Sequence, residues 1–142
     1  MIKVFDYMEH DLDKIRFNYW CRLLKNAKCL RNMKAYLKEA YSYTLYDDRP
    51  VAILAFHQYN DGMYDGCIIA DEDFGKNPKY AIRMKRLIEQ VVKHFKMKRV
   101  QTTSEDSPVL NKWHIFLGFK LEKKDALIKR GVHYNLWGMQ WE

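Results

Sequence analysis

The segment from Met63 to Thr103 constrains the fold more than any other part of the chain, because it predicts a strand, a long helix and a second strand. Met63–Ala70 ends in a nearly continuous apolar run, which is typical of a central strand buried on both faces. Asn77 and Pro78 then suit the cap and the first position of a helix. The helix carries apolar residues at three- and four-residue spacing, namely Met84, Leu87, Ile88, Val91, Val92 and Phe95.

Arg99–Thr103 follows that helix and reads as a strand. A helical crossover of this length returns over the sheet, so it joins two parallel strands. The turn compositions of the other segments favour antiparallel neighbours, for example Asn60-Asp61-Gly62 before the strand at Met63. We therefore expect a sheet with one parallel pairing in an otherwise antiparallel arrangement.

The remaining elements complete the expected order β-α-α-β-β-β-α-β-α-β-β. The fold class is α/β (α+β), with a single domain over residues 1–142 and helices on both faces of a mixed, mostly antiparallel sheet. The other expected strands are Ile2–Met8, Tyr43–Tyr46, Val51–Tyr59, Phe119–Lys123 and His133–Trp141, and the other expected helices are Asp11–Leu24, Leu30–Tyr41 and Pro108–Phe116, the last ended by Gly118.

Composition limits the classes of protein that this chain can be. Its 142 residues suit one globular domain, and 48% apolar residues exclude a largely disordered chain. Cys21, Cys29 and Cys67 form no C-x-x-C pair, so neither a disulfide framework nor a zinc site is indicated, and no metal is expected. We expect a cytoplasmic protein with no membrane segment. The net charge of +7 favours an anionic partner. Nucleic acid is not favoured, because the lysines and arginines are scattered along the chain rather than clustered in a stripe.

The segment Asn111-Lys112-Trp113-His114-Ile115-Phe116-Leu117-Gly118-Phe119, together with the element order, resembles the GNAT acetyltransferase superfamily. In that family a helix ends in Gly-Phe before a strand. Many members have a tyrosine four residues before this glycine, and the tyrosine protonates the departing CoA thiolate. His114 occupies that position here. The resemblance implies a fold that binds acetyl-CoA and transfers its acetyl group to an amine-bearing substrate.

The resemblance also implies a cofactor site after the central strand. The loop Asp71–Pro78 has one glycine where the family places a glycine-rich pyrophosphate cradle, so the loop is atypical. A helix start offers unpaired N–H groups to a phosphate, and cations there favour a bound anion. Alternatively, Asp71, Glu72 and Asp73 neutralise those cations. The implied cofactor-binding residues are Ala70, Gly75, Lys76, Asn77, Lys79, Arg83 and Ser107.

Acetyl transfer to an amine needs a base and an acid. Glu72 and Glu105 each follow a strand and are candidates for the base, with His114 as the acid. The alternatives are plain surface carboxylates, a histidine packed against Trp113 or Phe116, and a Ser107 that only caps a helix.

The sequence is also similar in style to small GNAT-like proteins of tailed bacteriophages. That similarity implies a catalytically inactive structural or interaction protein, located in the virion or the host cytoplasm and binding a protein partner, with an oligomer as one form. A nucleic-acid-binding module is the third alternative.

Overall fold

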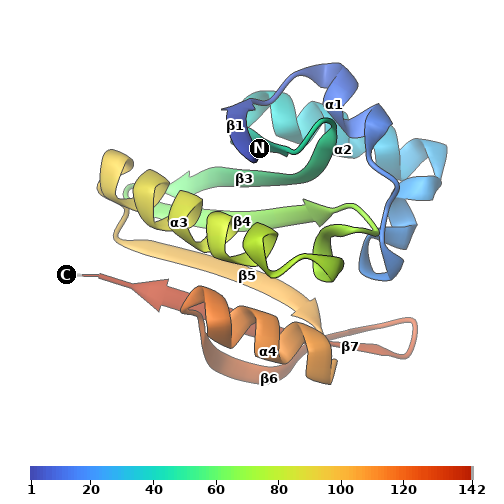
Figure 1. Ribbon diagram of the computed structural model, residues 1–142. Helices are drawn as coiled ribbons and strands as arrows, with labels where there is room; N and C mark the ends of the chain where they lie inside the picture. Colours follow the sequence, from blue (N-terminus) through green and yellow to red (C-terminus); the bar gives the residue numbers. More distant parts are fainter. Residues whose placement is uncertain (142) are drawn as a thin grey trace. The chain divides into compact units, whose positions relative to one another are not determined.

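The computed structural model describes residues 1–141 and shows an α+β architecture built on a seven-stranded sheet (Figure 1). The strand order is β1-β2-β3-β4-β5-β7-β6. The strands are β1 (Lys3–Asp6), β2 (Tyr41–Tyr46), β3 (Pro50–Asn60), β4 (Met63–Ala70), β5 (Arg99–Glu105), β6 (Lys120–Lys129) and β7 (Val132–Gln140). The helices are α1 (Glu9–Lys14), α2 (Ala27–Glu39), α3 (Pro78–Phe95) and α4 (Pro108–Leu117), with short 3₁₀ helices η1 (Tyr19–Lys25) and η2 (Phe74–Lys76).

The predicted crossover is confirmed. β4 pairs with β5 in parallel, whereas β1–β2, β2–β3, β5–β7 and β6–β7 are antiparallel. α3 begins at Pro78, and the side chain of Asn77 accepts a hydrogen bond from the N–H of Lys79 at 3.0 Å. Gly118 ends α4 with φ 100°, the left-handed conformation that a glycine adopts without a Cβ clash. The mixed, mostly antiparallel sheet therefore has the expected parallel step.

The chain divides into two compact units, of which the first comprises Met1–His57 and Cys67–Ile88. Ile53 and Ala55 of β3 pack into an apolar cluster with α1 and α2 through Leu12 and Leu37. Because side chains alternate along a strand, Leu54 points to the opposite face, and it is buried too. β3 is thus buried on both faces over Ile53–Ala55.

The second unit comprises Gln58–Gly66 and the residues from Glu89 onward. Its centre is the β5–β7–β6 part of the sheet, with α4 lying over β7 (Figure 1). His114 of α4 stacks on Trp137 of β7 with ring centroids 5.2 Å apart, and Phe119 meets the same imidazole edge to face at 5.6 Å. These aromatic contacts hold α4 on the sheet.

The predicted first helix differs from the structure. The expected helix over Asp11–Leu24 is interrupted, because α1 ends at Lys14 and Ile15 is extended. Phe17 then forms an isolated antiparallel bridge with Asp71, and η1 begins only at Tyr19. Hydrogen bonds to the segment after β4 therefore override the helical apolar pattern.

Two further expectations are corrected. β4 is central in strand order, but Ile68 is only half-buried, whereas Ile69 is 2% exposed. The last hairpin is longer than expected, because β6 continues to Lys129 across two register irregularities and Asp125 has φ 53°. A bulged strand bends and breaks the alternation that predicts its length.

The part of the chain that the structure describes contains no helix long and apolar enough to cross a membrane. Within the same residues, no group of three or more His, Cys, Asp or Glu side chains is arranged to hold a metal ion.

Candidate functional site

The loop that follows β4 is held by backbone hydrogen bonds both to other segments and within itself. The N–H of Asp71 donates to Val51 on β3 at 2.9 Å, and the N–H of Glu72 donates to Arg16 at 2.8 Å. Phe74 and Lys76 donate to the carbonyls of Asp71 and Asp73, respectively. The loop therefore holds its own shape without glycine-rich backbone.

One N–H group of this loop stays open. Over residues 71–80, the N–H of Gly75 has no acceptor among the described residues, whereas Lys79 donates to the Asn77 side chain. A Cβ added at Gly75 would meet nothing within 4 Å, so space lies over this backbone. An open N–H group beside free space, just before a helix start, can bind a phosphate group.

Asp71 is the centre of the charges at this loop, and its side chain is fully buried. Arg49 binds it with both terminal nitrogens, at 2.7 Å to Oδ1 and 2.9 Å to Oδ2. The N–H of Arg16 donates to Oδ1 at 2.9 Å and the N–H of Asp73 donates to Oδ2 at 2.9 Å. A buried carboxylate needs such donors, because unpaired charge in the interior is costly.

The charges on Asp71 and Asp73 are coupled through the two arginines. Arg49 Nη2 also reaches Asp73 Oδ2 at 2.7 Å, and Arg16 Nη2 reaches the same oxygen at 2.6 Å. Burial by itself would raise the pKa of Asp71, but hydrogen bonds from Arg49 and from the N–H groups of Asp73 and Arg16 hold the pKa well below its usual range. Asp71 is thus ionised throughout the neutral range.

Not every cation near the loop is neutralised. Arg16, Arg49 and Lys76 form ion pairs with the three carboxylates Asp71, Glu72 and Asp73. Among the described residues, Lys79 and Arg83 have no ion-pair partner on the first turns of α3. The predicted neutralisation therefore accounts for Lys76 and leaves these two cations at a helix start, where the helix dipole disfavours positive charge.

Among the described residues, the ladder between β4 and β5 covers only the beginning of β4, Met63–Asp65. The N–H of Asp71 faces β3, whereas the carbonyl of Ala70 accepts from the N–H of Asn18 at 3.1 Å on the other side. Because successive residues alternate, Ile68 directs its backbone N–H and C=O to the same side as Ala70, before the Asn18 contact begins. An extended ligand with amide groups could add to this edge as a strand does.

The predicted site residues fall into two groups. The first unit contains Ala70, Glu72, Gly75, Lys76, Asn77, Lys79 and Arg83, and the second contains Glu105, Ser107 and His114. Glu72 is half-exposed and pairs with Arg16 Nη1 at 3.3 Å. Ser107 is the N-cap residue of α4, but its side chain makes no capping hydrogen bond. The fold brings the predicted loop residues together.

His114 is 7% exposed and Nδ1 lies 2.7 Å from the carbonyl oxygen of Leu110. A carbonyl only accepts, so Nδ1 carries a proton. Burial lowers the pKa of His114, which favours the neutral ring, and Nε2 then has no proton to give. In this geometry the imidazole supports α4 packing better than it supports the predicted role of acid.

Sequence reasoning missed Arg16 and Arg49. They lie 55 and 22 residues from Asp71, on a helix connection and a hairpin turn. A single sequence carries no signal for such a distant pair. The acidic run Asp71-Glu72-Asp73 was the available sign that cations would gather here.

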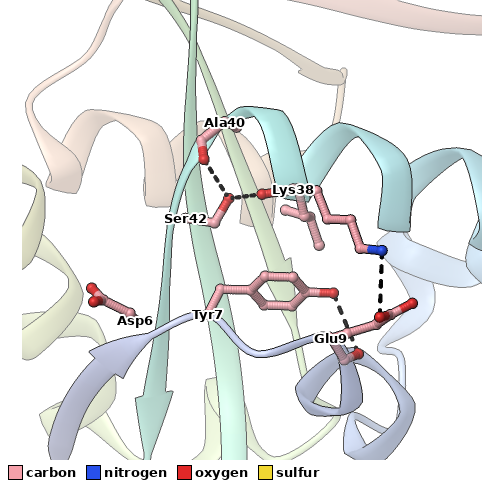
Figure 2. Close-up of a pocket in the computed structure, with 7 residues that line it drawn as sticks. Asp6, Tyr7, Glu9, Lys38, Ala40 and Ser42 are labelled. Carbon is pink, nitrogen blue, oxygen red and sulfur yellow. Dashed lines mark hydrogen bonds and ion pairs between the residues drawn. The ribbon is translucent and has the colours of Figure 1, made fainter.

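A separate pocket of about 260 Å³ lies in the first unit between β1 and the end of α2 (Figure 2). Ser42 of its lining pairs with Ala55, and Asp71 contacts Val51, so the two places are about 13 Å apart along β3. Lys38 binds Glu9 at 3.4 Å and the Ser42 hydroxyl donates to the Leu37 carbonyl at 2.8 Å. Much of the polar lining of this pocket thus already forms hydrogen bonds and ion pairs with other groups of the protein, so we assign the pocket no ligand.

The fold is that of the GNAT acetyltransferases. An acetyltransferase of the GNAT family from Bacillus anthracis superposes with a TM-score of 0.74 at 12% identity, over 98% of this chain and 94% of that one. The IAA acetyltransferase of Bacillus cereus gives 0.71 at 12% identity, over 99% and 100%. YncA of Salmonella typhimurium, in complex with its cofactor acetyl-CoA, gives 0.74 at 10% identity, over 99% and 94%.

Comparisons of sequence add nothing to this assignment, since no protein-family model and no curated protein match the chain. At these identities the superpositions show the fold alone.

Proposed function

We propose that this protein is an acyl-CoA-dependent N-acetyltransferase with an atypical pyrophosphate loop. The observation that carries the proposal is the segment leading into α3, which combines the open N–H of Gly75 with Lys79 and Arg83, two cations that have no ion-pair partner among the described residues. The helix dipole makes this arrangement unfavourable unless an anion binds. A diphosphate supplies that anion.

The end of β4 supports the same ligand. Ile68 offers a backbone donor and acceptor just before the loop, and the pantetheine part of CoA is an extended chain that carries amides. The residues that would hold acetyl-CoA are therefore Ile68 and Ala70 along the strand and Gly75, Lys76, Asn77, Lys79 and Arg83 at the phosphates. Ser107 stays a prediction for the same ligand.

Acetyl-CoA supplies a thioester carbonyl that an amine can attack. Glu105 or Glu72, acting through water, accepts the proton that the amine loses, and the CoA thiolate leaves with a proton from solvent or from an acid of the chain. Glu72 lies on the loop itself and pairs with Arg16, so its release from that ion pair would accompany proton transfer.

The test is a calorimetric titration with acetyl-CoA, followed by an acetyl-transfer assay against a panel of amines. Lys79→Glu should weaken binding at least tenfold. Lys28→Glu is the matched control, because Lys28 occupies the same position after Asn26 in α2, with its N–H bound to that cap at 2.9 Å. No heat and no thermal shift at millimolar acetyl-CoA, or equal losses in both variants, would overturn the proposal.

A second candidate is a catalytically inactive GNAT-fold protein that binds a protein partner, such as a component of a phage virion. The buried, Nδ1-protonated His114 favours it, because this ring occupies the position from which an acid would act. This candidate predicts acetyl-CoA binding without turnover, or neither. Acetyl transfer by the wild-type protein would exclude it.

A further inference from the structure

We infer that Asp71 is the positioning residue of the anion-binding loop, taking the structural place of the missing glycines, and that cofactor affinity depends on it through Arg49 and Arg16. The inference rests on the proposed function. It concerns a residue that lies within the core of the first unit and does not itself touch the phosphates.

The first step is the connectivity of the Asp71 carboxylate. It binds the backbone N–H of Asp73, two residues further along the loop, and the backbone N–H of Arg16, which lies 55 residues earlier. Backbone hydrogen bonds join the same two segments, because the N–H of Glu72 donates to the Arg16 carbonyl and the N–H of Asn18 donates to the Ala70 carbonyl. Asp71 thus fixes the start of the loop against a segment that is itself held in the apolar cluster through Phe17.

The second step is the role of Arg49. Its Nη2 atom lies 2.9 Å from Asp71 and 2.7 Å from Asp73, so one guanidinium holds both carboxylates. Asp73 in turn binds Lys76 at 3.2 Å, and its carbonyl accepts the N–H of Lys76. The chain of contacts from Arg49 to Lys76 spans Gly75, whose N–H is open.

The third step is the comparison with a glycine-rich loop. Glycines let a backbone approach a phosphate but leave the loop flexible. Asp71 instead orders this loop through the hydrogen bonds that its buried carboxylate accepts. Gly75 has no positive φ, so nothing in its conformation requires glycine. The positioning here is done by side-chain hydrogen bonds rather than by glycine conformations.

The experiment compares Asp71→Asn with Asp13→Asn by native-state hydrogen exchange and acetyl-CoA calorimetry. Asp13 is a matched control, since this carboxylate in the same unit pairs with Lys34 at 2.7 Å but is half-exposed. Asp71→Asn should speed exchange at Asp73, Phe74 and Lys76 by tenfold or more, while β3 amides such as Ile53 keep their protection. Binding of acetyl-CoA should fall at least tenfold, with kcat at saturation retained.

Arg49→Lys keeps the experiment decisive if Asp71→Asn does not fold. Lysine keeps the charge but cannot bind two carboxylates as a fork, so both effects should be intermediate. Unchanged loop exchange, or loss of protection in β3 to the same extent, would overturn the inference. If wild-type protein binds no acetyl-CoA, the proposed function fails, and hydrogen exchange alone then decides the role of Asp71.

Discussion

Replacing Gly138 of β7 by alanine should break an ion pair on the neighbouring strand. A Cβ at this position would lie 2.5 Å from Cδ of Glu122, far closer than real contacts allow. Glu122 binds Arg99 through both of its oxygens, with Oε2 2.7 Å from Nη1. The glycine therefore provides the space in which this carboxylate meets Arg99.

The magnitude follows from the burial of the pair. The side chains of Arg99 and Glu122 are 16% and 32% exposed, so solvent screens them only in part. Hydrogen bonds to charged groups contribute about 1.5–3 kcal/mol in folded proteins, and partial exposure lowers this. Gly→Ala at an unstrained position stabilises a protein by about 0.4–1 kcal/mol, because it lowers the conformational entropy of the unfolded chain. Gly138→Ala should thus lower the free energy of unfolding by roughly 0.5–2 kcal/mol.

Urea denaturation of a double-mutant cycle tests this reasoning. In a Glu122→Ala background the clash is gone, so Gly138→Ala should be neutral or stabilising. Gly75→Ala is the matched control, because nothing lies within 4 Å of its added Cβ, and its effect should stay within about 0.5 kcal/mol. Stabilisation by Gly138→Ala in the wild-type background would refute the proposed contact.

Three further predictions concern the loop and α4. The folded-state pKa of Asp71 is depressed, so the contribution of this carboxylate to stability is present above the unfolded pKa of about 4 and is lost as pH falls below it. When the free energy of unfolding is measured against pH in acid, Asp71→Asn should therefore show a flatter profile than wild type. Burial also lowers the pKa of His114, so wild-type stability should fall as pH drops below about 6.5; His114→Phe, followed by thermal unfolding against pH, should remove this dependence, and an unchanged profile would contradict the burial argument. Arg83→Glu should weaken pyrophosphate binding at least threefold in calorimetry while leaving the urea midpoint within error, whereas unchanged binding would remove Arg83 from the site.

The sequence predicted the parts of the fold that depend on local patterns. α3 has strong amphipathic spacing and a Pro78 start, and Gly118 ends α4, so each boundary has a physical signal within a few residues. The parallel step followed from chain length between two strands. These elements were found because no distant contact competes with them.

Elements that depend on tertiary contacts were missed. The segment Arg16–Asn18 has a helical pattern around it, yet it is extended because Asp71 binds the Arg16 N–H. The role of His114 depended on its burial against Trp137, which a single sequence does not reveal. For the candidate site, the sequence located the loop and its cations but could not show that Lys76 is paired while Lys79 is not.

Acetyl-CoA should bind along β4 and at the start of α3. Two-dimensional NMR of the labelled protein during acetyl-CoA addition tests this binding most directly, since each backbone N–H reports its own contact. The amides of Ile68, Gly75 and Asn77 should shift together and saturate with one affinity. Saturable shifts confined to other residues, or no shifts at millimolar acetyl-CoA, would contradict it.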